Sequence, residues 1–180
     1  MPNGSFQVVK TFVKTLLIAY NINQNFTQFA LITVAATAQA QFTLAASENG
    51  GVPALVDPVP YDGSNGQNMT AALTLLTSAY TQPSNGYRND AQHIVIYITS
   101  NAEFTDGDPI SQSNTIRRAG TWGIATLAYG ILSGDSNNLI QLSGNYCSCY
   151  YHVGNPTDLN TNGINFLQSR TCFDGLLCAS

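Results

Sequence analysis

Residues that could carry out acid–base or nucleophilic chemistry are scarce in this sequence. The two histidines, His93 and His152, are of a type that often acts as a general base, but neither lies in a recognisable motif with a nucleophile. We interpret both as structural or surface residues. Catalysis needs several polar groups within mutual hydrogen-bonding reach. The sequence offers no such set, so we expect no catalytic residues, no cofactor and no enzymatic activity.

Two short segments resemble ligand sites only in part. Three acidic residues follow an apolar run and could together form a metal-binding site. They are Glu103, Asp106 and Asp108. A solvated loop in which Asp108 caps the next helix explains the same residues, and we prefer that interpretation. Gly63–Gly66 (GSNG) precedes a predicted helix, as a phosphate loop would, but it lacks the Gly-Lys-Ser/Thr ending of such loops. We predict a tight loop there.

The four cysteines of the chain are Cys147, Cys149, Cys172 and Cys178. An even number clustered near one end favours two disulfides and an oxidising compartment. A zinc site is the alternative, although this spacing fits known zinc sites poorly. On an extended strand Cys147 and Cys149 would point the same way, with Cα atoms about 6.5–7 Å apart. We therefore expect each of them to pair with Cys172 or Cys178, in either of two registers.

Three N-x-S/T sequences make Asn3, Asn25 and Asn68 candidate glycosylation sites. Together with the predicted disulfides they favour a secreted, extracellular protein. Met1–Ser5 lacks the charged and apolar regions of a signal peptide, so we expect a fragment or a processed form.

The composition limits the classes of partner. The chain has 180 residues, of which 44% are hydrophobic and only 9% charged, and its net charge is -4. This length suits one domain with a substantial core. The absence of basic patches excludes nucleic acid as a partner, and no apolar run approaches the about 20 residues of a membrane span. Low charge also weakens repulsion between subunits of an assembly.

The elements that position these residues alternate between helices and strands. His93–Asn101 (HIVIYITSN) is predicted to be a strand buried on both faces at the centre of a parallel sheet. Ligands of such sheets bind beyond the carboxyl ends of the strands. Helices are predicted at Ser5–Asn21, Asn68–Tyr80, Ser111–Ala119, Asn137–Leu142 and Pro156–Thr171, and further strands at Phe29–Ala35, Gln41–Ala45, Trp122–Tyr129 and Tyr146–Val153. We expect the first two of these strands to form a hairpin. The alternation indicates an α/β fold.

Five segments occur in an order and spacing that resemble a known family. They are an FQxVKxFVKxL helix, FALITVAATAQAQFTLA, PYDGSNGQNMTAAL, HIVIYITSN and GTWGIATLAYG. The chain resembles a von Willebrand factor type A domain, most of all the secreted nematode ones, over Ser5–Leu167. The resemblance implies a Rossmann-like, doubly wound, mostly parallel sheet of strand order 3-2-1-4-5-6 with helices on both faces. We expect a single domain over residues 1–180, with a Cys-rich segment at 146–180.

The sequence departs from the family pattern at its metal site. The family's first strand, which ends in D-x-S-x-S, precedes the first helix, but here only Met1–Gly4 do. Gln67 stands where the family has a metal-binding Thr, and Ser100 where it has an Asp. Neither carries the charge that a divalent cation prefers. We expect a degenerate metal-ion-dependent adhesion site without bound metal, and a candidate ligand edge formed by Gln67, Ser100, Asn101 and Glu103.

The resemblance implies a secreted protein-binding or adhesion module for a protein or glycan ligand. The alternative is a structural subunit of an extracellular polymer, as a homo-oligomer or with a strand-donating partner chain. The missing strand belongs between Phe29–Ala35 and His93–Ser100, and its absence would leave backbone groups unpaired. We expect the gap to be filled by residues before Met1 or by a strand added from another chain.

Overall fold

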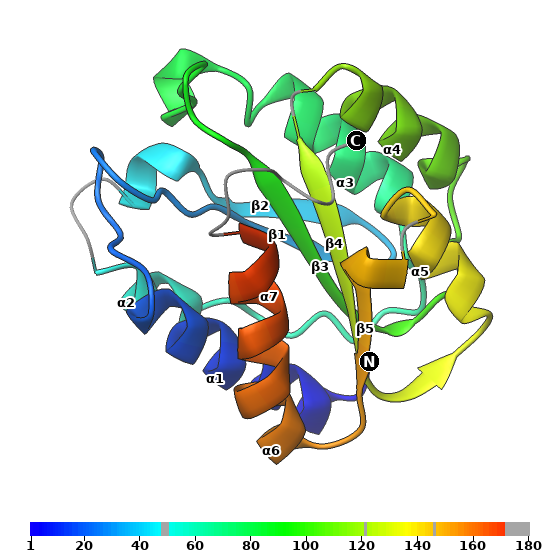
Figure 1. The fold of residues 1–180 in the computed structure, drawn as a ribbon. Coiled ribbons are helices and arrows are strands. Elements are labelled where there is room, and N and C mark those ends of the chain that lie inside the picture. The colour runs from blue at the N-terminus through cyan, green and yellow to red at the C-terminus, as the bar shows by residue number, and fades with distance from the viewer. Residues whose placement is uncertain (48–50, 121, 146, 172–180) are drawn as a thin grey trace. The chain divides into compact units, whose positions relative to one another are not determined.

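We describe residues 1–47, 51–120, 122–145 and 147–171 of a computed structural model (Figure 1). The chain divides into two compact units. One contains Pro2–Asp90, and the other contains Met1 and the residues from Ala91 onward. Each is described by itself.

The first unit begins with the predicted amphipathic helix. Helix α1 runs over Asn3–Ile18, with Phe12, Val13, Leu16 and Leu17 buried on one face. Its opposite face carries both lysines, Lys10 and Lys14. Ser5, where the helix is predicted to begin, lies inside it. Pro2 is the N-cap residue and no side chain caps the helix, since a proline side chain has no oxygen that could accept from the first helical N–H groups.

A two-stranded hairpin and a helix complete the framework of this unit. Strands β1 (Leu31–Val34) and β2 (Ala38–Phe42) pair antiparallel, as predicted. Helix α3 (Met69–Ser78) follows, and Tyr80 just beyond it donates a hydrogen bond to the carbonyls of Leu31 and Phe42 at 3.2 and 3.1 Å. The shorter elements of this unit are η1 (Leu44–Ser47), α2 (Val52–Val56) and η2 (Pro83–Asn85).

The second unit contains the predicted parallel sheet. Strands β3 (Ile94–Asn101), β4 (Gly123–Ser133) and β5 (Tyr150–Val153) pair in that order, all parallel. Helix α4 (Pro109–Arg118) connects β3 to β4, and α5 (Ser136–Leu142) lies between β4 and β5 in sequence. Figure 1 shows α4 and α5 on one side of these strands and α6–α7 on the other. This arrangement confirms the expected α/β class.

The prediction for β3 was wrong in one respect. Strand β4, and not β3, is the middle strand of the described sheet. The side chains of Ile94, Val95, Ile96 and Ile98 are only half-buried, whereas Ile124, Ala125, Leu127 and Ala128 of β4 are fully buried. The reason is that β3 has one strand neighbour in its sheet. An apolar run alone cannot tell a strand with one neighbour from a strand with two.

The C-terminal part also differs from the prediction. Cys147–Cys149 forms a 3₁₀ turn, η3, and the strand begins only at Tyr150. The helix expected at Pro156–Thr171 is divided into α6 (Pro156–Asp158), a π-helical turn η4 (Leu159–Gly163) and α7 (Ile164–Thr171). A glycine at the end of the π turn explains the irregularity, because glycine weakens a regular helix.

Candidate functional site

The predicted ligand edge is held by hydrogen bonds within its own loop. Ser100 is 9% exposed, and Asn101 is half-buried at the carboxyl end of β3. The Asn101 side-chain oxygen accepts the Glu103 N–H at 2.9 Å, and the Thr99 hydroxyl donates to the Asn101 carbonyl at 2.9 Å. The Asn101 N–H in turn donates to the Thr99 hydroxyl oxygen at 3.0 Å. The Asn101 side-chain oxygen and the Thr99 hydroxyl are therefore already engaged in the turn.

Gln67, the fourth position of that edge, belongs to the other unit. Its side chain is 4% exposed, and its backbone carbonyl accepts the Met69 N–H at 2.9 Å. The structure thus brings together Ser100, Asn101 and Glu103. Gln67 lies two residues before the start of α3.

The acidic residues after β3 take up separate positions. Asp108 caps α4 by accepting the Ser111 N–H at 2.9 Å, as the sequence predicts. Glu103 is exposed. Within the described part of the chain, no three His, Cys, Asp or Glu side chains are grouped so that they could hold a metal ion.

Both histidines have local partners. The His93 ring lies 4.8 Å from the Trp122 ring, centroid to centroid. His152 Nε2 lies 2.7 Å from the Gly130 carbonyl oxygen, which joins the ends of β4 and β5. Neither arrangement contains a nucleophile.

Arg117 is a polar residue whose role the sequence does not reveal. It is one of the two arginines in the last turn of α4, and it is only 8% exposed. Its guanidinium donates to the Asn114 side-chain oxygen and lies so close to Gly144 that a Cβ on that residue would be 2.1 Å from Nη1. Arg117 therefore packs α4 against the end of α5.

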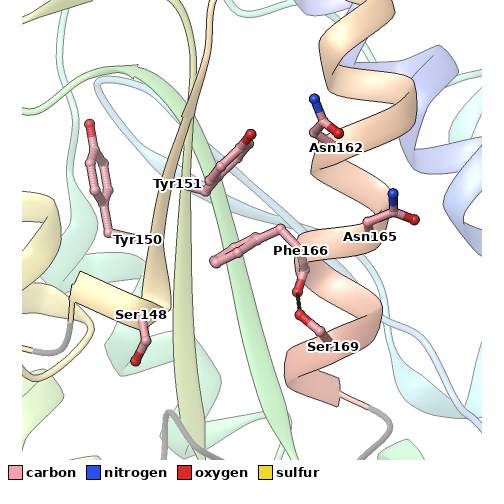
Figure 2. Close-up of a pocket in the computed structure, with 7 residues that line it drawn as sticks. All are labelled: Ser148, Tyr150, Tyr151, Asn162, Asn165, Phe166 and Ser169. Carbon is pink, nitrogen blue, oxygen red and sulfur yellow. Dashed lines mark hydrogen bonds between the residues drawn. The ribbon is translucent and has the colours of Figure 1, made fainter.

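An open pocket of about 410 Å³ lies beside β5 (Figure 2). Tyr151 of β5 and Phe166 of α7 face one another there, with ring centroids 5.3 Å apart and planes inclined by 19°. Burial raises the pKa of the Tyr150 hydroxyl, and a hydrogen bond with Ser136 acts in the opposite direction. The complete lining is Ser148, Tyr150, Tyr151, Asn162, Asn165, Phe166 and Ser169.

The side chains that line this pocket are all uncharged. Aromatic faces offer apolar contact, while amides and hydroxyls can donate and accept hydrogen bonds. Such a lining suits a neutral polar ligand better than a cation. No site is predicted at these residues from the sequence. The spacing of Asn162, Asn165, Phe166 and Ser169 by three and four residues was the available signal, because it places all of them on adjacent positions of one helical surface.

The three candidate glycosylation sites differ in structure. Asn3 is the first residue of α1, and its side-chain oxygen accepts a hydrogen bond from Gln7 at 3.3 Å. Asn68 is the N-cap residue of α3, but its side chain does not cap the helix. Its amide nitrogen instead donates to the Ala36 carbonyl at 2.5 Å. Asn25 is exposed in a loop.

Of the four cysteines, only the side chain of Cys149 lies in the described part of the chain. It is fully buried, and its sulfur is assigned to a disulfide. Cys172 and Cys178 lie outside the described residues, as does the side chain of Cys147. The predicted pairing therefore stays a prediction.

Comparison with protein families identifies the domain. The model of the von Willebrand factor type A domain matches residues 1–163, and thus runs through both units. The chain belongs to the von Willebrand factor type A domain family. The resemblance inferred from the five sequence segments is confirmed.

Two curated relatives of this von Willebrand factor A domain belong to much longer proteins. Protein irg-7 of Caenorhabditis elegans is 28% identical over 183 residues, an alignment that covers 92% of this chain and 8% of the relative. The collagen alpha-1(XII) chain of Notophthalmus viridescens is 25% identical over 171 residues. That alignment covers 93% of this chain and 18% of the collagen chain. The chain therefore spans less than a fifth of either relative.

Solved structures share the fold. Proximal thread matrix protein 1 from the mussel byssus superimposes with a TM-score of 0.81 at 15% identity, covering 93% of this chain and 43% of that one. A second structure of the same byssus protein has a zinc-occupied MIDAS motif. It matches with a TM-score of 0.77 at 20% identity, covering 90% of this chain and 40% of that one. Manganese-loaded TRAP of Plasmodium vivax matches with a TM-score of 0.70 at 13% identity, covering 89% and 64%. In the described residues of this chain, no helix has the length and hydrophobicity needed to cross a bilayer.

Proposed function

We propose that this von Willebrand factor A domain is an extracellular, non-enzymatic binding module that engages a protein or glycan ligand without a metal ion. The observation that carries the proposal is the family match over residues 1–163, because domains of this family are generally interaction modules. The extracellular assignment is supported by relatives and neighbours named as a collagen chain and a thread matrix protein.

Metal independence is supported by the chemistry of the candidate edge. Two structural neighbours hold zinc or manganese. At the positions that the family pattern assigns to this edge, the sequence has the uncharged residues Gln67, Ser100 and Asn101, together with one carboxylate, Glu103. Mg²⁺ and Mn²⁺ bind through hard oxygen ligands that usually include carboxylates, and the Asn101 oxygen is already occupied by the Glu103 N–H.

The proposal is tested by measuring binding with and without metal. The purified chain is applied to a panel of immobilised matrix proteins and to a glycan array, once in Mn²⁺ and once in a chelator. We expect a ligand that is bound equally well in both buffers. Binding that requires Mn²⁺, or that is lost in the chelator, would contradict metal independence.

We propose as a second candidate function that the chain is a structural subunit that accepts a strand from a partner chain. The observation that favours it is the free edge of β3. The His93 carbonyl accepts the Gly123 N–H at 2.9 Å, and backbone groups of alternate residues in a strand point to opposite edges of the sheet. Ile94, Ile96 and Ile98 therefore direct their backbone groups away from β4.

The side chains of β3 also suit strand addition. Ile94, Val95, Ile96 and Ile98 are half-buried and apolar, and no charged residue occurs from Ala91 to Ala102. Proteins usually protect a free edge with charges or prolines, and β3 has neither. An added strand would complete the burial of these side chains.

Light scattering coupled to size exclusion separates the two candidates. A binding module elutes as a monomer, whereas a strand-accepting subunit forms larger species. In the second case Ile96→Lys should return the chain to monomer, because a charge at the edge disfavours pairing. Ile18→Lys on α1 is the matched control, since Ile18 is 76% exposed on another element, and it should leave the assembly intact.

A further inference from the structure

The loop from Asn21 to Thr27 is an ordered structure outside the helices and strands. The Asn23 N–H donates to the Thr27 carbonyl at 3.0 Å, and the Thr27 N–H donates to the Asn21 carbonyl at 3.2 Å. The Asn23 amide also donates to the Asn21 side-chain oxygen at 2.8 Å. These bonds close the loop on itself.

Arg88 fixes this loop from outside. Its guanidinium donates to the Gln24 carbonyl at 3.0 Å and to the Phe26 carbonyl at 2.5 Å. The two acceptors flank Asn25, so the backbone on both sides of that residue is held in place. Phe26 itself is 62% exposed.

Asn25 occupies the projecting part of the loop. Its backbone N–H donates to the Asn23 side-chain oxygen at 2.8 Å, which forms an Asx-turn. Its own side chain is exposed, and within the described residues its carboxamide makes no hydrogen bond. Thr27, the hydroxyl residue of the N-x-S/T sequence, stands two positions later in the same closed loop.

Asn68 has the opposite environment. It is half-buried, and its amide nitrogen, the atom that would carry a sugar, donates to the Ala36 carbonyl. The next residue, Met69, is 2% exposed and begins α3. A sugar would replace one of the two hydrogens on this nitrogen, beside the atom that already donates to Ala36, and would have to enter a packed region. The folded chain cannot carry it without local rearrangement.

We infer that Asn25 carries an N-linked glycan in the extracellular protein and that Asn68 does not. This inference rests on the proposed extracellular function. The co-substrate is a polyprenyl-pyrophosphate-linked oligosaccharide. The Asn25 amide nitrogen forms a bond to the anomeric carbon of its first sugar, the bond from that carbon to the pyrophosphate oxygen breaks, and the nitrogen loses one proton. No oxidation or reduction takes place.

The test uses the full chain expressed behind a signal peptide in a secretory eukaryotic host, with a well-glycosylated N-x-T sequence in an appended tail. Enzymatic removal of N-glycans in heavy-oxygen water converts each glycosylated asparagine to a labelled aspartate, which peptide mapping then locates. We expect the label on Asn25 and on the tail, and none on Asn68. Intact mass should drop by one glycan in Asn25→Gln and in Thr27→Ala, and should not change in the matched control Asn68→Gln.

Label on the tail but not on Asn25, or label on Asn68 in the folded monomer, would overturn the inference. The first result would leave the proposed binding function untouched, because it concerns only the modification. Conversely, a glycan on Asn25 in a chain that binds no matrix ligand would contradict the binding function and leave the glycosylation site standing.

Discussion

At the scale of single residues, Gly86 joins two turns through a very close backbone contact. Its φ angle is 88°, and a Cβ at this position would lie 2.5 Å from the Ala45 nitrogen and 2.8 Å from the Leu44 carbonyl carbon. Both neighbours are backbone atoms, which cannot move aside as a flexible side chain can. The residue therefore requires both the conformational freedom and the small size of glycine.

Gly86→Ala should lower the free energy of unfolding by about 2–4 kcal/mol, as the sum of left-handed backbone strain and overpacking. Urea denaturation measures the change. Gly51→Ala is the matched control, because Gly51 has a φ of 75° but no atom near its would-be Cβ. It should cost only about 1–2 kcal/mol. Equal losses in the two variants would show that the contact with Ala45 is unimportant.

A second residue-scale prediction concerns Asp57. A hydrogen bond from Lys14, at 2.7 Å, lowers the pKa of the Asp57 carboxyl below its usual value. Because the folded pKa is the lower one, the pair contributes to stability above the unfolded pKa near 4, and that contribution is lost as the pH falls through the folded pKa.

Lys14→Ala should raise the pKa of Asp57 towards its ordinary value. Carbon-detected NMR titration of the side-chain carboxyls measures it. Asp62 is the internal control, because its lowered pKa comes from hydrogen bonds with Ser64 and should not change. A pKa of Asp57 that is unaffected by the substitution would refute the pairing in solution.

At the scale of elements, Tyr80 fastens the β1–β2 hairpin. Its side chain is 1% exposed, and its hydroxyl donates to two carbonyls that belong to opposite strands of the hairpin. Tyr80→Phe leaves those two acceptors without this donor and should lower the free energy of unfolding by about 1–2 kcal/mol.

Chemical denaturation of Tyr80→Phe and Tyr129→Phe tests this role. Tyr129 is also buried, at 6% exposure, but its hydroxyl forms no hydrogen bond with the described residues, so its replacement should have little effect. Similar losses in both variants would show that the Tyr80 hydrogen bonds do not hold the hairpin.

The elements with a strong internal pattern could be predicted from the sequence. Helix α1 shows a regular apolar stripe, β4 is an apolar run, and Asp108 stands at a helix start. The position of β3 at the end of its described sheet could not be predicted, because hydrophobicity records what a strand can bury and not which strands are beside it. The turn at Cys147–Cys149 was missed because alternation over so few residues also fits a strand.

The candidate site could be predicted only in part. Ser100, Asn101 and Glu103 were identified because a ligand edge follows the end of an apolar strand. The hydrogen bonds that engage the Asn101 side chain could not be foreseen, since they depend on the loop conformation. The burial of Arg117 could not be foreseen either, because it arises from packing between α4 and α5.

At the scale of the whole molecule, we predict two disulfides that join Cys147 and Cys149 to Cys172 and Cys178. Each should contribute about 3 kcal/mol. Peptide mapping without reduction should recover both pairs in one of the two registers. Four free thiols, or a bond between Cys147 and Cys149, would contradict the prediction.

The central claim for the whole molecule is that this von Willebrand factor A domain works without a metal ion. Titration calorimetry with Mg²⁺ and Mn²⁺ tests it most directly, with the triple variant Glu103→Gln, Asp106→Asn, Asp108→Asn as the control for weak binding by the acidic loop. We predict no saturable binding of either ion to the natural chain. A micromolar dissociation constant that survives in the triple variant would contradict the account.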